Sequence, residues 1–302
     1  MFPRESAAPT FSILAVIVRM RIPLGDLIGM PQPNHENQQY PPSLSSADDR
    51  GAPGLSGQSL VRLYRGYART VSPFAYLVRS LIRRTANMGI TAANCLDIGA
   101  GTAAYAWDIE RHLQTTTYIA LDIAPSDRCN LVGDACALPV ADATMNLVVC
   151  FEVIGHVADP ARVLQEIART LKPGGILLMT FPFLYGECDF RDYHRWTLEG
   201  MCADVRSCGF KIVQANPRGG PMFALVCAVN WALQHTIPGQ RRSWRAGRSA
   251  SHMLRTAMTL VLTAPTTLLL WLALGIDRLL PMRGFYMGGS IIARKPEGDG
   301  LD

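Results

Sequence analysis

Short apolar runs alternate with amphipathic stretches through the middle of the chain, which predicts an α/β protein built on a parallel sheet. After Asp159-Pro160, residues such as Leu164 and Ile167 recur at the spacing of a helix that packs on a sheet. Residues 146–151 form a nearly continuous apolar run, which indicates a central strand covered on both faces. The predicted strands cover residues 94–98, 117–122, 130–132, 146–151, 176–181 and 210–215, and a last strand covers 286–295.

Helices are predicted between these strands from their start and stop signals. Thr197 is expected to be the N-cap of one of them. The turn Lys172-Pro173-Gly174-Gly175 ends another. The helix that connects the second and third strands is expected to be a single turn or absent. The predicted helices begin at Pro73, Ala103, Pro160 and Leu198.

The N-terminal 58 residues are rich in Pro, Ser, Gln, Asn and Gly and have no sustained periodicity, which predicts a disordered extension or a misassigned start. The apolar run Phe11–Val18 is too short to span a bilayer. Arg19 and Arg21 stand where a signal peptide would have its cleavage site. The chain is therefore divided into a disordered extension (1–58), a ligand-binding core (59–220), a hydrophobic and basic helical insertion (221–284), and a final strand with its tail (285–302).

A glycine turn follows the first predicted strand. Gly99 and Gly101 allow backbone angles and a close approach that a Cβ atom would block, and the helix start beyond them offers N–H groups to a ligand. The pattern also fits a dinucleotide-binding turn. Asp122, 23 positions after Gly99, can accept hydrogen bonds from ribose hydroxyls in either kind of fold. Asp97 separates the two interpretations. A carboxylate there would repel a pyrophosphate but would hold a cationic amino-acid group, which favours S-adenosylmethionine (SAM) over NAD.

Four motifs, in order, resemble those of the class I SAM-dependent methyltransferases, in particular the small-molecule type associated with surface-glycan gene sets. The resemblance covers residues 90–215 and 285–295. It implies a Rossmann-like, seven-stranded α/β sheet of order 3-2-1-4-5-7-6 with the last strand antiparallel. Ala103 stands where the family often has a third glycine, and we expect it to narrow the cofactor cleft only slightly. The motifs are Leu96–Thr102, Asp122, Gly133-Asp134-Ala135 with Leu138-Pro139, and Leu171-Lys172-Pro173-Gly174-Gly175.

The resemblance also implies which residues hold SAM. The Asp134 carboxylate would accept a hydrogen bond from the exocyclic amine of adenine, and the Ala135 N–H would face a ring nitrogen. A helix cap is the other role open to Asp134. The expected cofactor residues are Asp97, Gly99, Ala100, Gly101, Asp122, Ile123, Asp134 and Ala135.

Polar residues follow the fourth and fifth strands, at the edge where open α/β sheets bind ligands. The segment 181–197 crowds aromatic and charged residues together, which indicates a binding loop. It resembles an Asp-Tyr-x-Arg-[Tyr/Trp]-Thr segment of small-acceptor methyltransferases, so Tyr193, His194 and Arg195 are expected on the acceptor side. A hydroxyl acceptor needs a base. The candidates are His156 and His194, then Glu152, and a purely structural role for His156 stays open.

The charge of +5 is concentrated in one segment. Residues 221–285 hold seven arginines against one acid, Asp277, and so carry about +6, whereas the remaining 22 basic and 23 acidic residues give about −1. This distribution argues against binding of nucleic acid over the whole surface. The eight cysteines show no zinc-binding spacing, so free thiols and no metal site are expected.

The insertion contains two apolar segments, Pro221–Leu233 and Thr256–Ile276. The second has 21 uncharged residues, enough to cross a bilayer. Both flanking strands belong to one sheet, so the chain crosses a membrane twice or not at all, and two crossings would violate the positive-inside tendency. Pro265 also suggests a broken helix. We therefore expect a helical hairpin on the inner face of a membrane, with the protein cytoplasmic and peripheral or monotopic. A soluble cap on the domain or in a dimer is the alternative.

Together these features predict a SAM-dependent methyltransferase with a small-molecule or lipid-linked acceptor, a membrane surface as partner and no nucleic-acid partner. A SAM-fold module that binds the cofactor without turnover and serves as a membrane scaffold is the alternative. An NAD-dependent reductase is a third hypothesis. An RNA methyltransferase is disfavoured, because no Asn-Pro-Pro-aromatic motif follows the fourth strand.

Overall fold

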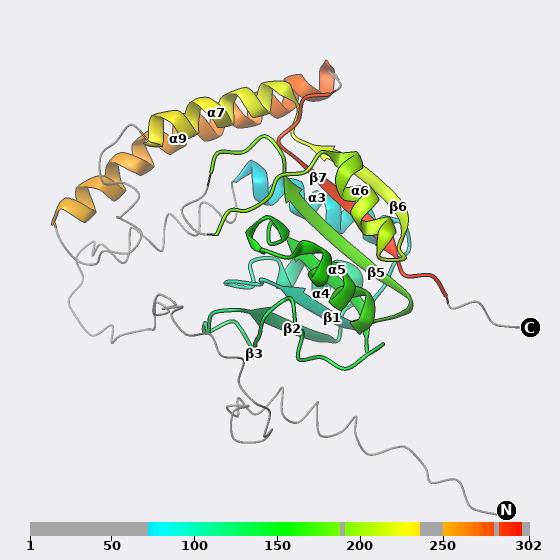
Figure 1. Ribbon diagram of the computed structural model, residues 1–302. Coiled ribbons are helices and arrows are strands. Elements are labelled where there is room, and N and C mark those ends of the chain that lie inside the picture. The colour runs from blue at the N-terminus through cyan, green and yellow to red at the C-terminus, as the bar shows by residue number, and fades with distance from the viewer. Residues whose placement is uncertain (1–71, 188–190, 236–249, 281–283, 298–302) are drawn as a thin grey trace, which may run out of the picture.

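The computed structural model describes residues 72–187, 191–235, 250–280 and 284–297. A seven-stranded sheet forms its centre, in the predicted order β3-β2-β1-β4-β5-β7-β6 (Figure 1). Only β7 runs antiparallel to its neighbours. The strands are β1 Asn94–Ile98, β2 Thr117–Asp122, β3 Leu131–Val132, β4 Met145–Phe151, β5 Leu171–Pro182, β6 Lys211–Arg218 and β7 Gly288–Arg294. The predicted disordered extension lies outside the described residues.

Helices cover both faces of the sheet, which makes a three-layer α/β domain (Figure 1). Apolar side chains of α5 and α6 pack on one face, and those of α3 and α4 pack on the other. The strands feed both cores, because successive side chains point to opposite faces. In β1, Leu96 and Ile98 join the α5/α6 core, whereas Cys95 joins the α3/α4 core. The helices are α3 Pro73–Asn87, α4 Ala106–Leu113, α5 Pro160–Thr170, α6 Leu198–Ser207, α7 Pro221–His235 and α9 Ala250–Leu279, with a 3-10 turn η2 at Ile154–His156.

Most predicted boundaries agree with the structure to within two or three residues. The Thr197 hydroxyl accepts the Gly200 N–H and so caps α6 as expected. The largest difference is at β5, which begins at Leu171 instead of residue 176, so the strand includes the predicted turn Lys172-Pro173-Gly174-Gly175. In addition, β6, which was predicted to end at Ala215, continues to Arg218. The strand can include Pro217 because β6 is an edge strand, where a proline costs no ladder hydrogen bond.

The insertion forms a helical hairpin, as predicted. Helices α7 and α9 lie side by side along one end of the domain (Figure 1). Their shared core includes Phe223 from α7 and Leu270 and Leu274 from α9, and Phe74 and Leu77 of α3 pack against it. Among the helices described, none is both long and apolar enough to cross a bilayer.

The suggestion that Pro265 breaks the second helix is wrong, because α9 continues through it. A proline inside a helix removes one backbone hydrogen bond and costs about 3 kcal/mol. Packing of α9 against α7 and α3 offsets this cost.

Asp277 of α9 fastens the hairpin to the end of β6. Its carboxylate accepts the N–H groups of Gly220, Met222 and Phe223, at 2.9, 3.0 and 3.0 Å, and so caps the first turn of α7. Gly220 leaves the room for it, since a Cβ atom there would lie 2.4 Å from the carboxylate carbon. The start of one helix therefore depends on a side chain near the end of the other.

Replacing Asp277 with alanine removes this cap, and we expect the free energy of unfolding to fall by about 1–2 kcal/mol. Urea unfolding followed by circular dichroism measures the loss. Asp277→Asn keeps one acceptor oxygen and should lose about half as much. Equal stability of Asp277→Ala and the wild type would contradict the capping role.

Candidate functional site

The turn after β1 has the geometry of a ligand-binding loop. Gly99 and Gly101 have φ angles of 67° and 54°, which favour glycine. A Cβ atom on Gly99 would lie 2.2 Å from the Val153 side chain, whereas nothing lies within 4 Å of one on Gly101. The turn is therefore pressed against the segment after β4 at its first glycine and open at its second.

Asp122 connects this turn to the end of β2. One carboxylate oxygen accepts the Gly101 N–H at 2.8 Å, and the other accepts the Ala124 N–H at 3.1 Å. The Ser126 hydroxyl donates to the Gly101 carbonyl at 2.9 Å. Ile123, which follows Asp122, is 37% exposed and presents an apolar surface beside the turn.

Asp97 is a buried carboxyl with an unusual environment. It is 4% exposed, and the Tyr118 hydroxyl donates a hydrogen bond to it. Burial raises the pKa of Asp97 to about 7, the Tyr118 hydrogen bond lowers it, and Asp122 raises it further. A carboxyl whose pKa is raised on folding stabilises the fold fully below its unfolded value near 4, and this contribution is lost as the pH rises through 7. The ionised form therefore gains most from a cationic partner.

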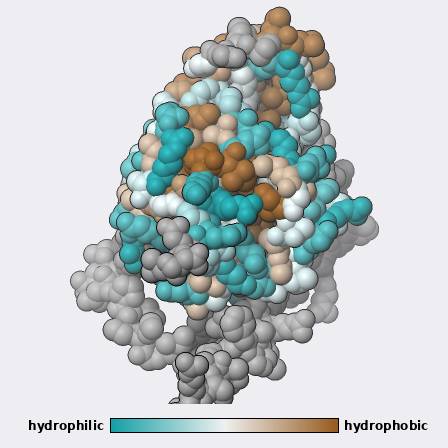
Figure 2. Space-filling view, turned by 90° about the vertical axis from the view of Figure 1, so that its right-hand side faces the viewer, coloured by the Kyte–Doolittle hydropathy of each residue, from teal (hydrophilic) through white to brown (hydrophobic). Residues whose placement is uncertain are grey.

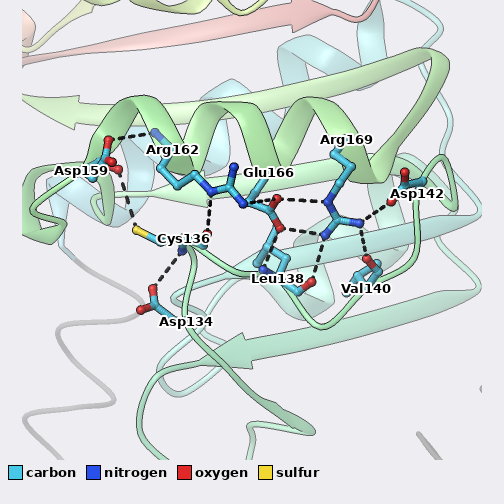
Figure 3. A network of polar contacts seen from close by, with 9 residues as sticks. All are labelled: Asp134, Cys136, Leu138, Val140, Asp142, Asp159, Arg162, Glu166 and Arg169. Carbon is cyan, nitrogen blue, oxygen red and sulfur yellow. Dashed lines mark hydrogen bonds and ion pairs between the residues drawn. The ribbon is translucent and has the colours of Figure 1, made fainter. Parts of the chain in front are cut away.

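A hydrogen-bond network on α5 fixes the loop after β3, which carries Asp134 and Ala135 (Figure 3). The buried Glu166 accepts the Leu138 N–H at 2.9 Å and pairs with Arg169 at 2.7 Å. Arg169 also donates to the Leu138 carbonyl at 2.9 Å. The hydrogen bond from Arg169 is the main reason that the pKa of Glu166 is lowered.

Asp134 also has a local role in this loop. Its Oδ1 atom accepts the Cys136 N–H at 2.9 Å (Figure 3). This contact is a turn cap, close to the alternative role considered for Asp134, and it orients the carboxylate at the end of β3. Ala135 is buried among the apolar residues beneath it.

A cavity of about 260 Å³ lies beyond the carboxyl ends of β4, β5 and β6, beside the glycine turn's helix. It has an apolar side, supplied mainly by α3 and α7, and a polar side, supplied by the segments after β4 and β5 and by the end of β6. Its lining residues are Phe74, Leu77, Val78, Tyr105, Glu152, His156, Pro182, Tyr185, Asp192, Arg195, Arg218, Phe223 and Met287.

The residues predicted for catalysis and for the acceptor side divide into two groups. Glu152 and His156 line the cavity, and so does Arg195. Tyr193 and His194 are not among its lining residues. Tyr193 is 53% exposed, and the His194 ring lies tilted against the Trp196 ring.

His156 is held in one tautomer. Its Nδ1 atom lies 3.0 Å from the Arg191 carbonyl oxygen, which can only accept a hydrogen bond, so Nδ1 carries the proton and Nε2 carries the lone pair. The Nε2 atom of His194 lies 3.4 Å from the Ala158 carbonyl, so there the lone pair is on Nδ1. A backbone carbonyl thus fixes the ring of each histidine, but only His156 lines the cavity.

Sequence reasoning missed Arg218, which is central to the cavity. Its guanidinium forms an ion pair with Glu152, and its side chain is 8% exposed. Glu152 itself has a φ of 58°, a strained value for a residue with a side chain. The missed signal was an arginine directly before Gly219-Gly220, which became informative only once β6 was known to reach it.

Residues 96–179 match a family model described as a methyltransferase domain. The malonyl-[acyl-carrier protein] O-methyltransferase of Methylococcus capsulatus is 32% identical over 32% of this chain and 40% of its own length. A human thiol S-methyltransferase is 37% identical over 22% of this chain and 23% of its own. The chain therefore spans less than half the length of these relatives. A solved phosphoethanolamine N-methyltransferase of Haemonchus contortus, in complex with SAM, aligns over 80% of this chain and 57% of its own, with 16% identity and a TM-score of 0.49.

The sheet order, the glycine turn after β1 and the matched domain define a Rossmann-like methyltransferase fold. Residues 96–179 are thus similar to a methyltransferase domain.

Ala103 affects the turn through its backbone rather than its size. Its φ is 50°, a left-handed conformation that costs an alanine about 1–2 kcal/mol. In addition to the slightly narrower cleft that we expect, Ala103 thus has a conformational cost.

Ala103→Gly should therefore raise the free energy of unfolding by about 0.5–1 kcal/mol, because relief of strain exceeds the added entropy of the unfolded chain. Chemical denaturation measures it. Ala104→Gly is the matched control: its φ is not positive, so the same exchange should destabilise the protein by a similar amount. If both substitutions destabilise the protein, the claim that the backbone of Ala103 is strained is wrong.

Proposed function

We propose that the protein is a SAM-dependent methyltransferase that acts on a small acceptor in the cavity beyond β4, β5 and β6. The observation that carries the proposal is the buried Asp97 beside an open glycine turn. A carboxyl with a pKa of about 7 in a site 4% exposed becomes favourable to ionise when a cation binds next to it. SAM has an ammonium and a sulfonium group, whereas the pyrophosphate of NAD is anionic.

The remaining cofactor contacts follow from the geometry around the turn. Asp122 is oriented by the Gly101 and Ala124 N–H groups at the end of β2, where it would accept ribose hydroxyls. Ile123 offers an exposed apolar side chain to the adenine, and Asp134 and Ala135 would read its polar edge from the loop that Glu166 and Arg169 hold. Gly99, Gly101 and Ala100 complete the surface.

Catalysis in this class depends chiefly on alignment and on exclusion of water. When bound, SAM supplies a methyl group on a good leaving group. The apolar residues Phe74, Leu77 and Phe223 would exclude water on the acceptor side. For an acceptor that must lose a proton, His156 is the favoured base because its Nδ1 is fixed by Arg191. Glu152 is less suited, since Arg218 occupies its carboxylate.

We further propose that the hairpin attaches the protein to a membrane surface. On α9, Leu268, Leu272 and Ile276 recur at four-residue intervals and are 62%, 56% and 39% exposed. On α7, Leu225 and Val229 are 55% and 51% exposed. Apolar residues gather over the upper end of the molecule, where Figure 1 places the hairpin (Figure 2). Such an amphipathic surface can enter the headgroup region without crossing the bilayer.

The cofactor proposal is tested by titrating SAM into the wild type and into Asp97→Asn, which keeps the shape of the side chain and removes its charge. We expect calorimetry to show at least about tenfold weaker binding. Glu199→Gln, the same acid-to-amide change on the exposed surface of α6, should bind SAM like the wild type. No binding of SAM to the wild type would overturn the proposal.

Turnover is tested separately, with methyl-labelled SAM and an extract of lipids and small metabolites. Label in an extracted compound supports a methyltransferase. Binding of SAM without any transfer would favour the non-catalytic scaffold.

The membrane proposal is tested by flotation with vesicles of phosphatidylcholine and phosphatidylglycerol. The wild type should float with the vesicles. The triple variant Leu268→Gln/Leu272→Gln/Ile276→Gln should bind them at least about tenfold more weakly, because each change removes apolar contact area. Val213→Gln, at an exposed position of β6 far from the hairpin, is the control. A wild type that stays at the bottom of the gradient would refute attachment.

A further inference from the structure

The polar side of the cavity contains two acids and two arginines, and these pair with one another. In the first pair, Arg218 at the end of β6 contacts one oxygen of the Glu152 carboxylate after β4. The Nε atom of Arg218 is enclosed by the protein, so a ligand in the cavity cannot reach it. The charge of Arg218 is therefore balanced within the cavity wall.

The second pair lies in the segment after β5. Arg195 places both terminal nitrogens on the buried carboxylate of Asp192. Its guanidinium also donates to the carbonyl oxygens of Tyr185, Gly186 and His194, at 3.5, 3.2 and 2.9 Å. These contacts engage every nitrogen of the guanidinium, so this arginine holds the segment in place and offers no free charge to a ligand.

A charged ligand would therefore enter the cavity without a counter-ion. Removal of an ion from water is unfavourable unless a group of opposite charge compensates it. The two acids and two arginines of the wall sum to zero charge, and a ligand could pair with one of them only by displacing its present partner. An uncharged ligand avoids both losses.

The opposite side of the cavity is apolar. Phe74 and Leu77 of α3 line it together with Phe223 of α7. The Phe74 ring lies edge-on to the rings of Phe223 and Tyr185, at 5.2 and 6.1 Å between centroids. A volume of about 260 Å³ accommodates one small ring or a short chain. The body of the ligand should thus be small and apolar.

A methyl acceptor also needs a nucleophilic atom. Carboxylates, phosphates and aliphatic amines have one, but each of these groups is charged at neutral pH. Hydroxyl and thiol groups are nucleophiles that stay largely uncharged at that pH. The half-exposed Glu152 side chain keeps its second carboxylate oxygen as an acceptor for the hydrogen of such a group.

We infer that the cavity binds a small, uncharged alcohol, phenol or thiol as its acceptor, and that the two ion pairs in its wall disfavour carboxylates and ammonium groups. The inference rests on the proposed function, since it names the class of acceptor for that site. Glu152 and Arg218 are specificity-determining residues in this account, because each cancels the charge of the other.

The test compares benzyl alcohol with benzoate and benzylamine, and 1-hexanol with hexanoate and hexylamine. Each probe is titrated at pH 7 into the protein saturated with S-adenosylhomocysteine, which lacks the sulfonium charge of SAM, and ligand-observed NMR gives the dissociation constants. We expect each alcohol to bind about tenfold more tightly than its carboxylate and its amine. A charged probe that binds as tightly as its alcohol, or more tightly, would overturn the inference.

Removal of one member of an ion pair should change the preference in a defined direction. Glu152→Gln leaves Arg218 without its counter-ion, so benzoate should bind this variant about tenfold more tightly than it binds the wild type, and benzylamine should gain nothing. Glu199→Gln removes the acid of the exposed pair with Arg206 on α6, and it should change neither affinity. Unchanged binding of benzoate to Glu152→Gln would contradict the inference.

Binding of S-adenosylhomocysteine reports whether each variant is folded and separates the two proposals. If the wild type binds S-adenosylhomocysteine but does not prefer alcohols to charged probes, the acceptor inference is wrong and the methyltransferase proposal stands. If Glu152→Gln does not fold, Arg218→Met replaces it. That change leaves Glu152 without its counter-ion, so benzylamine should gain about tenfold, and the lack of such a gain would equally contradict the inference.

Discussion

The structure depends on how the chain accommodates one buried acid, Asp97, in the first strand. Its neighbours Leu96 and Ile98 bury in the α5/α6 core, so the alternation of the strand directs Asp97 to the other face, near Tyr118 of β2. There burial opposes ionisation, and the fold without ligand is more stable when Asp97 is protonated. In our proposal, a cation bound at the adjacent glycine turn would reverse this preference, and this coupling would make the turn selective for a cationic ligand.

The hairpin and the cavity share residues and contacts. Arg218 ends β6, Gly220 follows, and Asp277 at the far end of α9 caps the helix that begins there. Phe223 in the first turn of α7 is part of the cavity wall. The hairpin and the ion pair of Arg218 with Glu152 are therefore joined through the short segment that follows β6.

Apolar periodicity predicted the sheet well, because buried parallel strands leave continuous runs such as residues 146–151. It failed where tertiary context overrides local preference: Pro217 is tolerated on an edge strand, and Pro265 inside a packed helix. Family motifs indicated the glycine turn and Asp122, which a hydrogen bond joins, but no motif indicated Arg218 or Phe223. Arg218 and Phe223 both reach the cavity only because the chain turns at Gly219. No local sequence pattern predicts that these two side chains line the same cavity. The direction of the His156 proton was equally unpredictable, since it depends on a carbonyl 35 residues away.

The most direct test of the central claim is the pKa of Asp97, measured by carbon-detected NMR titration of the side-chain carboxyl with and without S-adenosylhomocysteine, whose amino group carries the relevant positive charge. The account predicts a pKa of about 7 for the free protein and a value at least about one unit lower in the complex. A pKa near 4 in the free protein, or one that does not change on binding, would contradict it.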